Sequence, residues 1–164
     1  MSNNHKIKLY NILLRLSREI FFYKKIELPD TFETRIYLMF FHFSILMIIA
    51  KKKGSKFNQK SYDNFFNNIE YNLRELGFGD VTVNKKMKEF NKILYDILLK
   101  VDNEKEKNRS FKLNHDLVSK YFITLKTAKN AKYIEFESYF TNFFHFCFEL
   151  PLDNMLEELE KFRI

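Results

Sequence analysis

Turn-forming residues are scarce in this sequence of 164 residues, which contains three glycines and two prolines. Sandwiches and small barrels of β-strands need many tight turns, and glycine and proline form most of them. The scarcity therefore argues against an all-β architecture and favours long helices joined by polar loops. Apolar residues make up 46% and charged residues 30%, which is typical of a folded globular chain and not of a disordered one.

The chain also lacks tryptophan, and Cys147 is its only cysteine, so it forms no internal disulfide. This cysteine usage suits a reducing compartment. Arg15, Arg18 and Glu19 interrupt the first apolar stretch, which is unlike a secretory signal. The longest apolar run, from Ile36 to Ala50, is shorter than the roughly 20 residues of a membrane-spanning helix and predicts a buried core helix.

The formal net charge of +7 is unevenly distributed. Residues 149–164 hold five acidic and two basic side chains, a balance of −3, so the rest of the chain carries +10. A basic body of this kind favours an acidic partner, such as anionic lipid, RNA or an acidic protein surface. No recognised nucleic-acid-binding motif accompanies the charge, and we expect no DNA partner.

Helical periodicity predicts one all-α domain, a bundle of about six to seven helices. The segment 31–52 is apolar on every face, so it should be the central helix of the bundle. A charged linker at 102–110 divides the domain into a half at 1–101 and a half at 111–164. Strand is an alternative for the last third of 134–148, because aromatic residues favour strands. The predicted helices span about 7–25, 31–52, 58–76, 83–101, 114–128, 134–148 and a short stretch after Pro151.

Two local signals mark helix ends in this pattern. Asp30, with Glu33 three residues later, resembles a capping box that starts the second helix. Gly77 is well placed as a left-handed residue after the third helix, with Phe78 then packing on Leu73. The two glycines at 77 and 79 thus predict a tight turn between helices.

No pattern points to catalysis or to a bound cofactor. The turn at Gly77 is no phosphate loop, because neither the Gly-x-Gly-x-x-Gly nor the Walker pattern is complete. We expect His42 to be a hydrogen-bonded core residue and Cys147 to be a small buried one. The sequence therefore predicts a protein that is not an enzyme and has no metal or cofactor. Four histidines have no second ligand at a metal-binding spacing: His5, His42, His115 and His145.

Three pieces of the sequence, taken in order, resemble one known family. They are Leu28-Pro29-Asp30-Thr31-Phe32 with Arg35, then Phe41-His42, and then Leu73-Arg74-Glu75-Leu76-Gly77-Phe78-Gly79-Asp80 followed by Val83, Lys85, Lys86, Met87 and Lys88. Through them, the segment 28–88 looks like the ubiquinol–cytochrome c chaperone family, which includes the mitochondrial cytochrome b assembly factors. The chain differs from the family pattern at Thr34, Asn84 and Asp96-Ile97.

The resemblance implies a helical protein that binds newly made cytochrome b and assists assembly of the cytochrome bc1 complex without catalysis. Mitochondrial relatives work with a small partner subunit and near the ribosome exit. For this chain we expect a cytoplasmic location, peripheral at the inner membrane face, with an anionic membrane surface as a further partner. The alternative is a peripheral membrane- or RNA-binding helical module.

The residues expected to bind the client lie within these pieces. An unfinished membrane segment is apolar, and we expect an aromatic groove between helices to shield it. The lysines at the start of the fourth helix oppose the helix dipole, which indicates a use in binding. The expected client-binding rim consists of Arg35, Arg74, Glu75, Asp80, Lys85, Lys86 and Lys88.

Overall fold

In the computed structural model, seven α-helices lie within the described residues, which are 2–105, 109–126 and 131–163. A π-helical turn (Phe21–Lys25) and two 3-10 turns (Ile123–Leu125 and Leu152–Asn154) connect some of them. The described residues contain no strand, so the all-α prediction is confirmed. The helices are α1 (Ser2–Ser17), α2 (Phe32–Lys52), α3 (Gln59–Glu75), α4 (Asp80–Lys100), α5 (His115–Tyr121), α6 (Ala131–Phe148) and α7 (Met155–Leu159).

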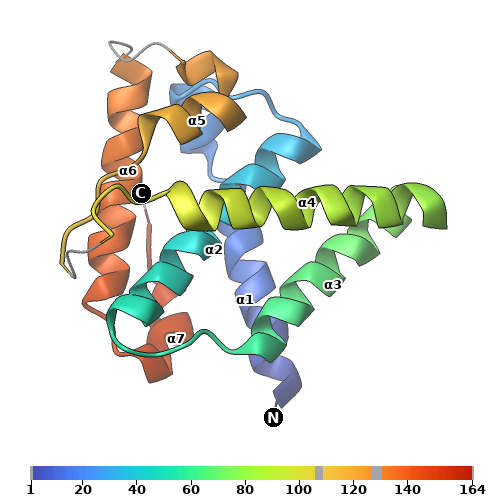
Figure 1. Ribbon diagram of the computed structural model, residues 1–164, viewed down its shortest axis with the longest axis horizontal. Helices are drawn as coiled ribbons and strands as arrows, with labels where there is room; N and C mark the ends of the chain where they lie inside the picture. Colours follow the sequence, from blue (N-terminus) through green and yellow to red (C-terminus); the bar gives the residue numbers. More distant parts are fainter. Residues whose placement is uncertain (1, 106–108, 127–130, 164) are drawn as a thin grey trace.

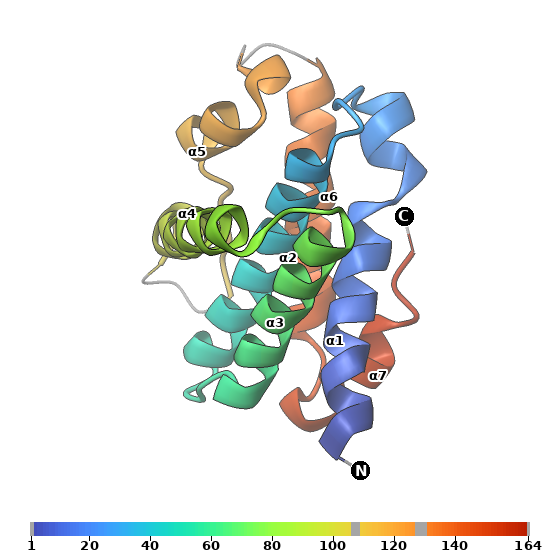
Figure 2. The same ribbon diagram turned by 90° about the vertical axis from the view of Figure 1, so that its right-hand side faces the viewer.

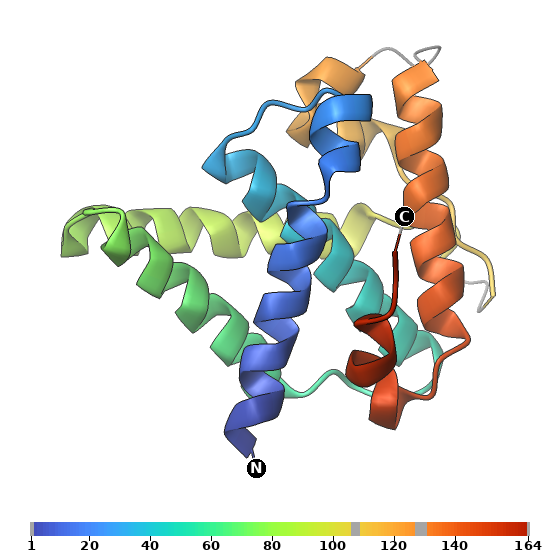
Figure 3. The ribbon, with the colours of Figure 1, turned by 180° about the vertical axis from the view of Figure 1, so that it is seen from behind.

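The central position of α2 explains why it is apolar on all sides. Helices α1, α4 and α6 pack around it, α3 packs against α1 and α4, and α7 lies on α1 (Figures 1 and 3). Among the described helices, α2 alone is long and apolar enough to cross a membrane, yet 67% of its most apolar stretch is buried inside the bundle. The predicted central helix is therefore confirmed, and its apolar surface is used in packing.

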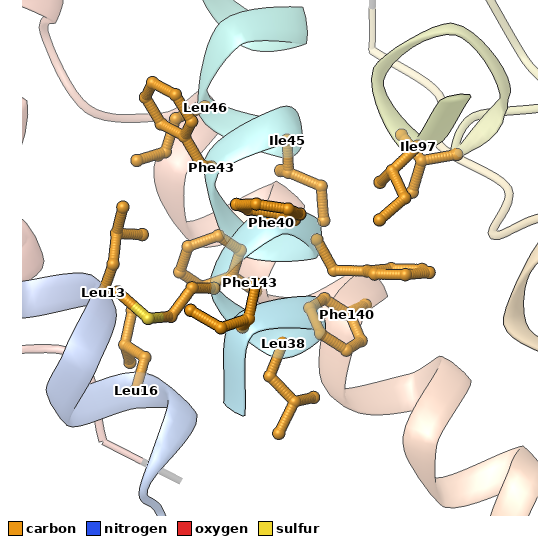
Figure 4. Packing of buried hydrophobic residues seen from close by; sticks show 14 of the residues in the cluster. Leu13, Leu16, Leu38, Phe40, Phe43, Ile45, Leu46, Ile97, Phe140 and Phe143 are labelled. Carbon is orange, nitrogen blue, oxygen red and sulfur yellow. The ribbon is translucent and has the colours of Figure 1, made fainter. Parts of the chain in front are cut away.

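Phenylalanine side chains fill a large part of the core. The rings of Phe40 and Phe43 on α2 lie 6.0 and 4.8 Å from the ring of Phe65 on α3. Figure 4 shows Phe143 of α6 reaching the same cluster. Of the twenty phenylalanines, Phe78 alone is classed as exposed. The expected aromatic groove is therefore wrong, because the rings fill the core of the bundle. On α6 the buried aromatic residues are Tyr133, Phe136, Tyr139, Phe140, Phe143 and Phe144.

Their spacing also decides the conformation of α6. Positions 136, 140, 143 and 147 recur every three or four residues and all are buried. A strand would send alternate residues to opposite faces and could not bury this set. The strand alternative for the end of α6 is wrong, and the helix continues to Phe148.

The first helix is shorter than predicted. It ends at Ser17, where the hydroxyl donates a hydrogen bond to the carbonyl of Leu14 at 2.7 Å, and the chain coils again in the π-helical turn. This break changes the phase of the helical stripe. One uninterrupted helix would place Ile20 on the same stripe as Leu9, Leu13 and Leu16, but Ile20 is exposed.

The start of α2 is capped one residue later than predicted. Thr31 Oγ1 accepts the backbone N–H of Thr34 at 3.2 Å, so Thr31 is the N-cap. Asp30 instead forms an ion pair with Arg35. The buried Thr34 hydroxyl lies 3.0 Å from Thr31 Oγ1, which gives a structural reason for threonine at this position.

Two other helices differ from the predicted bounds. Helix α4 begins at Asp80, before the predicted start at 83, because an acidic residue suits the first turn of a helix. Helix α5 ends at Tyr121, and the remainder of the predicted helix to Ala128 is a 3-10 turn followed by residues outside the described part.

The predicted linker at 102–110 is anchored to the bundle at both ends. Asp102 is 1% exposed, and its Oδ2 lies 2.9 Å from Lys52 Nζ in an ion contact. Asp102 Oδ1 accepts the backbone N–H groups of Glu104 at 2.8 Å and Lys112 at 3.0 Å. Lys52 Nζ also donates to the Ser110 carbonyl at 2.8 Å. Residues 106–108 of the linker lie outside the described part.

Candidate functional site

The α3–α4 corner, which we define as residues 74–81, projects from the bundle on the side opposite α6 (Figures 1 and 3). Gly77 has φ +95°, the left-handed conformation predicted for the residue after α3. The N–H of Gly77 donates to the Arg74 carbonyl at 3.0 Å, and the N–H of Phe78 donates to the Leu73 carbonyl at 3.3 Å. These bonds set a fixed angle between α3 and α4.

Arg74 holds the two helices of the corner together. Its guanidinium lies 3.1 Å from Glu70 of α3 and also pairs with Asp80, the first residue of α4. Hydrogen bonds to Asp80 and then Glu70 raise the pKa of Arg74 above its ordinary value. Arg74 and Asp80 were both predicted in the binding rim, but the structure shows that they neutralise each other.

The predicted rim is not one contiguous cluster. Arg35 pairs with Asp30 at the start of α2. The neighbouring ring of Phe32 lies 6.3 Å from Phe90, which is on the middle of α4 and away from its first turn. Glu75 does lie on the corner and is exposed.

The three lysines of the rim point in two directions. Helical spacing places Lys85 and Lys88 on one outward line of α4, and both are exposed. Lys86 turns toward the corner, where its Nζ lies 5.1 Å from the centroid of the Phe78 ring. This is the distance of a cation–π contact.

The outward line of α4 continues in both directions and forms what we call the α4 ridge. Its members follow one another at spacings of three or four residues, so they share one face of the helix. Every member is exposed, and Figure 2 shows α4 nearly end-on at the outside of the molecule. The α4 ridge consists of Val81, Lys85, Lys88, Lys92, Tyr95 and Leu99.

Apolar side chains are exposed beside these lysines. Val81 is 84% exposed, Leu76 is 60% exposed and Phe78 is 39% exposed. Helical spacing puts Leu76 on the same stripe as the buried Ile69 and Leu73, but Leu76 is exposed because the end of α3 extends past the helices that cover its earlier turns (Figure 1). At the other end of the ridge, Leu99 is 61% exposed.

The ridge was only partly visible in the sequence. Lys85 and Lys88 were predicted as binding residues, whereas Val81, Tyr95 and Leu99 were not. A usable signal was present, because these three apolar residues lie on the polar face of an otherwise amphipathic helix. Apolar residues at such positions are candidates for contact with a partner.

Comparison with protein families identifies the chain. The sequence profile described as Ubiquinol-cytochrome C chaperone matches residues 24–133, which is more than half of the chain. The chain belongs to the ubiquinol-cytochrome C chaperone family. This confirms the resemblance seen in residues 28–88, and the match extends past α4 into α5 and the start of α6. Neither the curated proteins nor the solved structures yielded a match.

The chaperone holds its most reactive side chains in the core. Both ring nitrogens of His42 are hydrogen-bonded, Nδ1 to the Leu38 carbonyl at 2.6 Å and Nε2 to the Tyr139 hydroxyl at 2.7 Å. Cys147 is buried, and burial raises the pKa of its thiol. Within the described residues, no three His, Cys, Asp or Glu side chains gather as metal ligands, and the His5 side chain lies outside them.

One departure of the chaperone from the family pattern joins α4 to α5. Asp96 lies 2.7 Å from Lys100, 2.8 Å from Lys120 and 2.5 Å from the Tyr121 hydroxyl. Burial raises the pKa of Asp96, but the hydrogen bonds from these three groups together lower it well below its ordinary value. Asp96 is therefore ionised, and its carboxylate is bound by Lys100, Lys120 and Tyr121. It does not neutralise the lysines of the α4 ridge.

Proposed function

We propose that this chaperone binds newly made cytochrome b and assists its assembly into ubiquinol–cytochrome c reductase, without catalysing a reaction. The observation that carries the proposal is the family match across residues 24–133, which includes the whole α3–α4 corner. Burial of His42 and Cys147 supports a role in binding, because neither side chain can reach a substrate. The proposed location is the cytoplasm, at the inner face of the membrane.

We place the client contact on the α3–α4 corner and the adjoining turns of α4. A membrane protein presents apolar segments and charged loops before it is assembled. Exposed Leu76 and Phe78 supply apolar contacts in place of the aromatic groove, and Glu75, Lys85 and Lys88 supply charged ones. Arg74 and Asp80 hold the shape of the corner, while Arg35, at the start of α2, is proposed as a separate client contact. A small partner subunit or a ribosome is a further partner implied by the family.

Recovery of cytochrome b in a pull-down tests the contact surface. The bait is the chaperone in detergent-solubilised membranes, as wild type and with Lys85, Lys86 and Lys88 changed to Glu. We expect the triple variant to recover about tenfold less cytochrome b, because charge reversal at a contact surface replaces attraction by repulsion. A matched variant changes Lys24, Lys56 and Lys60, which are exposed elsewhere, to Glu and should recover as much as wild type. Equal recovery by both variants removes these three basic residues of α4 from the mechanism.

Deletion of the gene tests the function itself. Cells without the chaperone should have membranes with a weakened cytochrome b absorbance spectrum, and the wild-type gene should restore it. An unchanged spectrum and an unchanged level of assembled reductase would contradict the proposed function, whatever the pull-down shows.

A further inference from the structure

The α4 ridge combines basic and apolar side chains, and all of its members are exposed. Val81 lies at one end, Tyr95 and Leu99 lie at the other, and three lysines lie between them. At 1.5 Å per residue, the line from Val81 to Leu99 is about 27 Å long. The ridge is therefore long and narrow, and it offers charge along its centre with apolar contact at both ends.

The lysines of the ridge are not committed to internal ion pairs. Within the described part of the chain, Lys85, Lys88 and Lys92 have no carboxylate partner within 4.0 Å. The acidic residues of α4 are Asp80, which pairs with Arg74, Glu89, which is exposed, and Asp96, which is bound to Lys100, Lys120 and Tyr121. The ridge thus presents net positive charge to the solvent.

The exposed apolar residues continue from the ridge into the corner. Leu76 and Phe78 precede Val81 in the chain and belong, like Val81, to the α3–α4 corner, which projects from the bundle (Figure 1). Lys86 lies over the Phe78 ring, so a cation borders the apolar end as well. Lysine stems and aromatic rings of this kind suit the boundary between water and acyl chains, where charged ends stay in water.

We propose that the α4 ridge docks on the surface of an anionic lipid bilayer. The lysines would contact lipid phosphates, while Val81 and Leu99 would enter the headgroup region at the two ends of the ridge. A bilayer fits this surface better than RNA does, because single-stranded RNA binding uses stacked aromatic rings and Tyr95 is the one aromatic residue of the ridge. The inference adds to the proposed function the surface by which the chaperone would bind the membrane. It rests on the proposed function only in that a client in the membrane has to be reached there.

Flotation with lipid vesicles tests the proposal without any client protein. Full-length chaperone is mixed with vesicles of phosphatidylcholine alone or of phosphatidylcholine with phosphatidylglycerol. We expect flotation with the anionic vesicles only, and weaker flotation at about 500 mM salt than at about 50 mM, because salt screens exposed charges. Absence of binding to anionic vesicles at low salt overturns the inference.

Two ridge variants separate charge from apolar insertion. Changing Lys85, Lys88 and Lys92 to Glu should lower vesicle partitioning by at least about 100-fold, since each lost lysine removes a factor of about five and each new carboxylate adds repulsion. Changing Val81 and Leu99 to Gln should lower it by about tenfold, because less apolar surface leaves water. Circular dichroism should show that both variants remain as helical as wild type.

Each variant has a control with the same change in composition elsewhere on the surface. One control reverses Lys24, Lys56 and Lys60, and the other changes the exposed residues Ile123 and Ile134 to Gln. Both controls should keep partitioning within about threefold of wild type, because the changed residues lie outside the ridge and salt screens long-range charge. Equal losses in ridge and control variants would show that net charge, and not the ridge, binds the vesicles.

The single variant Leu99→Gln also separates this inference from the proposed function, because Leu99 lies near the end of α4 and outside the α3–α4 corner, to which Val81 belongs. In detergent extracts, where no bilayer is present, it should recover cytochrome b as wild type does. Loss of vesicle binding with retained recovery supports the ridge as a membrane surface. Full vesicle binding by this variant, or binding of single-stranded RNA in place of vesicles by wild type, contradicts it.

Discussion

At the scale of single residues, His42 shows how a polar group is accommodated in an aromatic core. The Leu38 carbonyl accepts hydrogen bonds only, so Nδ1 of His42 carries the proton. Nε2 is then an acceptor for the Tyr139 hydroxyl. Desolvation lowers the pKa of His42 to about 3, although the bond to Leu38 opposes this shift. The ring is therefore neutral in the folded chain.

His42 should make the protein less stable in weak acid. Its ordinary pKa is 6.5, so between 6.5 and about 3 the unfolded chain binds a proton that the folded chain does not. The stabilisation is complete above 6.5 and is lost as pH falls through this window. Between about pH 7 and about pH 5.5, we expect the free energy of unfolding in urea to fall by about 1 kcal/mol from this residue. His42→Gln should show a smaller fall, and an equal fall would refute this assignment.

At the scale of helices, the corner depends on one backbone conformation. Gly77 and Gly79 both have open space where a Cβ would lie, but Gly77 alone of the two has a positive φ. The two glycines therefore differ in whether their backbone conformation suits a residue with a Cβ, and not in the space that surrounds them. Since α4 starts directly after this turn, the direction of the α4 ridge depends on Gly77.

Replacement of Gly77 by Ala should destabilise the protein by about 1 kcal/mol, because L-residues disfavour the left-handed conformation. The measurement is urea unfolding at neutral pH. Gly79→Ser is the control, since Gly79 is the N-cap of α4 with an extended backbone that serine adopts readily. We expect this change to be neutral or slightly stabilising. Similar losses for both variants would mean that the turn conformation is not what stabilises the corner.

At the scale of the whole molecule, the buried pair of Lys52 and Asp102 joins the first half of the chain to the linker, and Asp102 also accepts the backbone N–H of Lys112 in the second half. Lys52 ends α2, and Asp102 follows α4 and begins the segment that leads to α5. Arg15 adds a second link, because its guanidinium donates to the carbonyls of Leu159 at 3.3 Å and Phe162 at 3.2 Å. From these contacts we predict that residues 1–101 and 111–164 unfold together.

Lys52→Met should destabilise the protein by about 3–5 kcal/mol, because it leaves the Asp102 carboxylate buried without its cation. Adding Asp102→Asn should restore part of this loss, since the amide oxygen can still accept the two backbone N–H groups while the charge is removed. Unfolding should remain a single transition by circular dichroism and by fluorescence. Separate transitions for the two halves, or additive losses in the double variant, would contradict the proposed coupling.

Local patterns predicted a large part of this structure. Helical periodicity located the helices, and composition marked α2 as the central one. The bounds failed at Ser17, Thr31 and Asp80, where a hydroxyl hydrogen bond or an acidic first turn moved a helix end by a few residues. The site was harder to predict. Arg74 and Asp80 look like free charges in the sequence, and only their proximity in space shows that they form a pair.

The all-α class, the apolar character of α2, the glycine stop at residue 77 and the family relationship follow from the order of residues alone, because periodicity and backbone sterics act over a few neighbouring positions. Tertiary packing decides which helix surfaces are buried against a neighbour and which remain exposed. A helical pattern shows which residues avoid water, but it does not show which neighbour covers them. For this reason, packing alone decided that the phenylalanines of α6 fill the core and that Val81, Leu99 and the lysines between them remain on an open face.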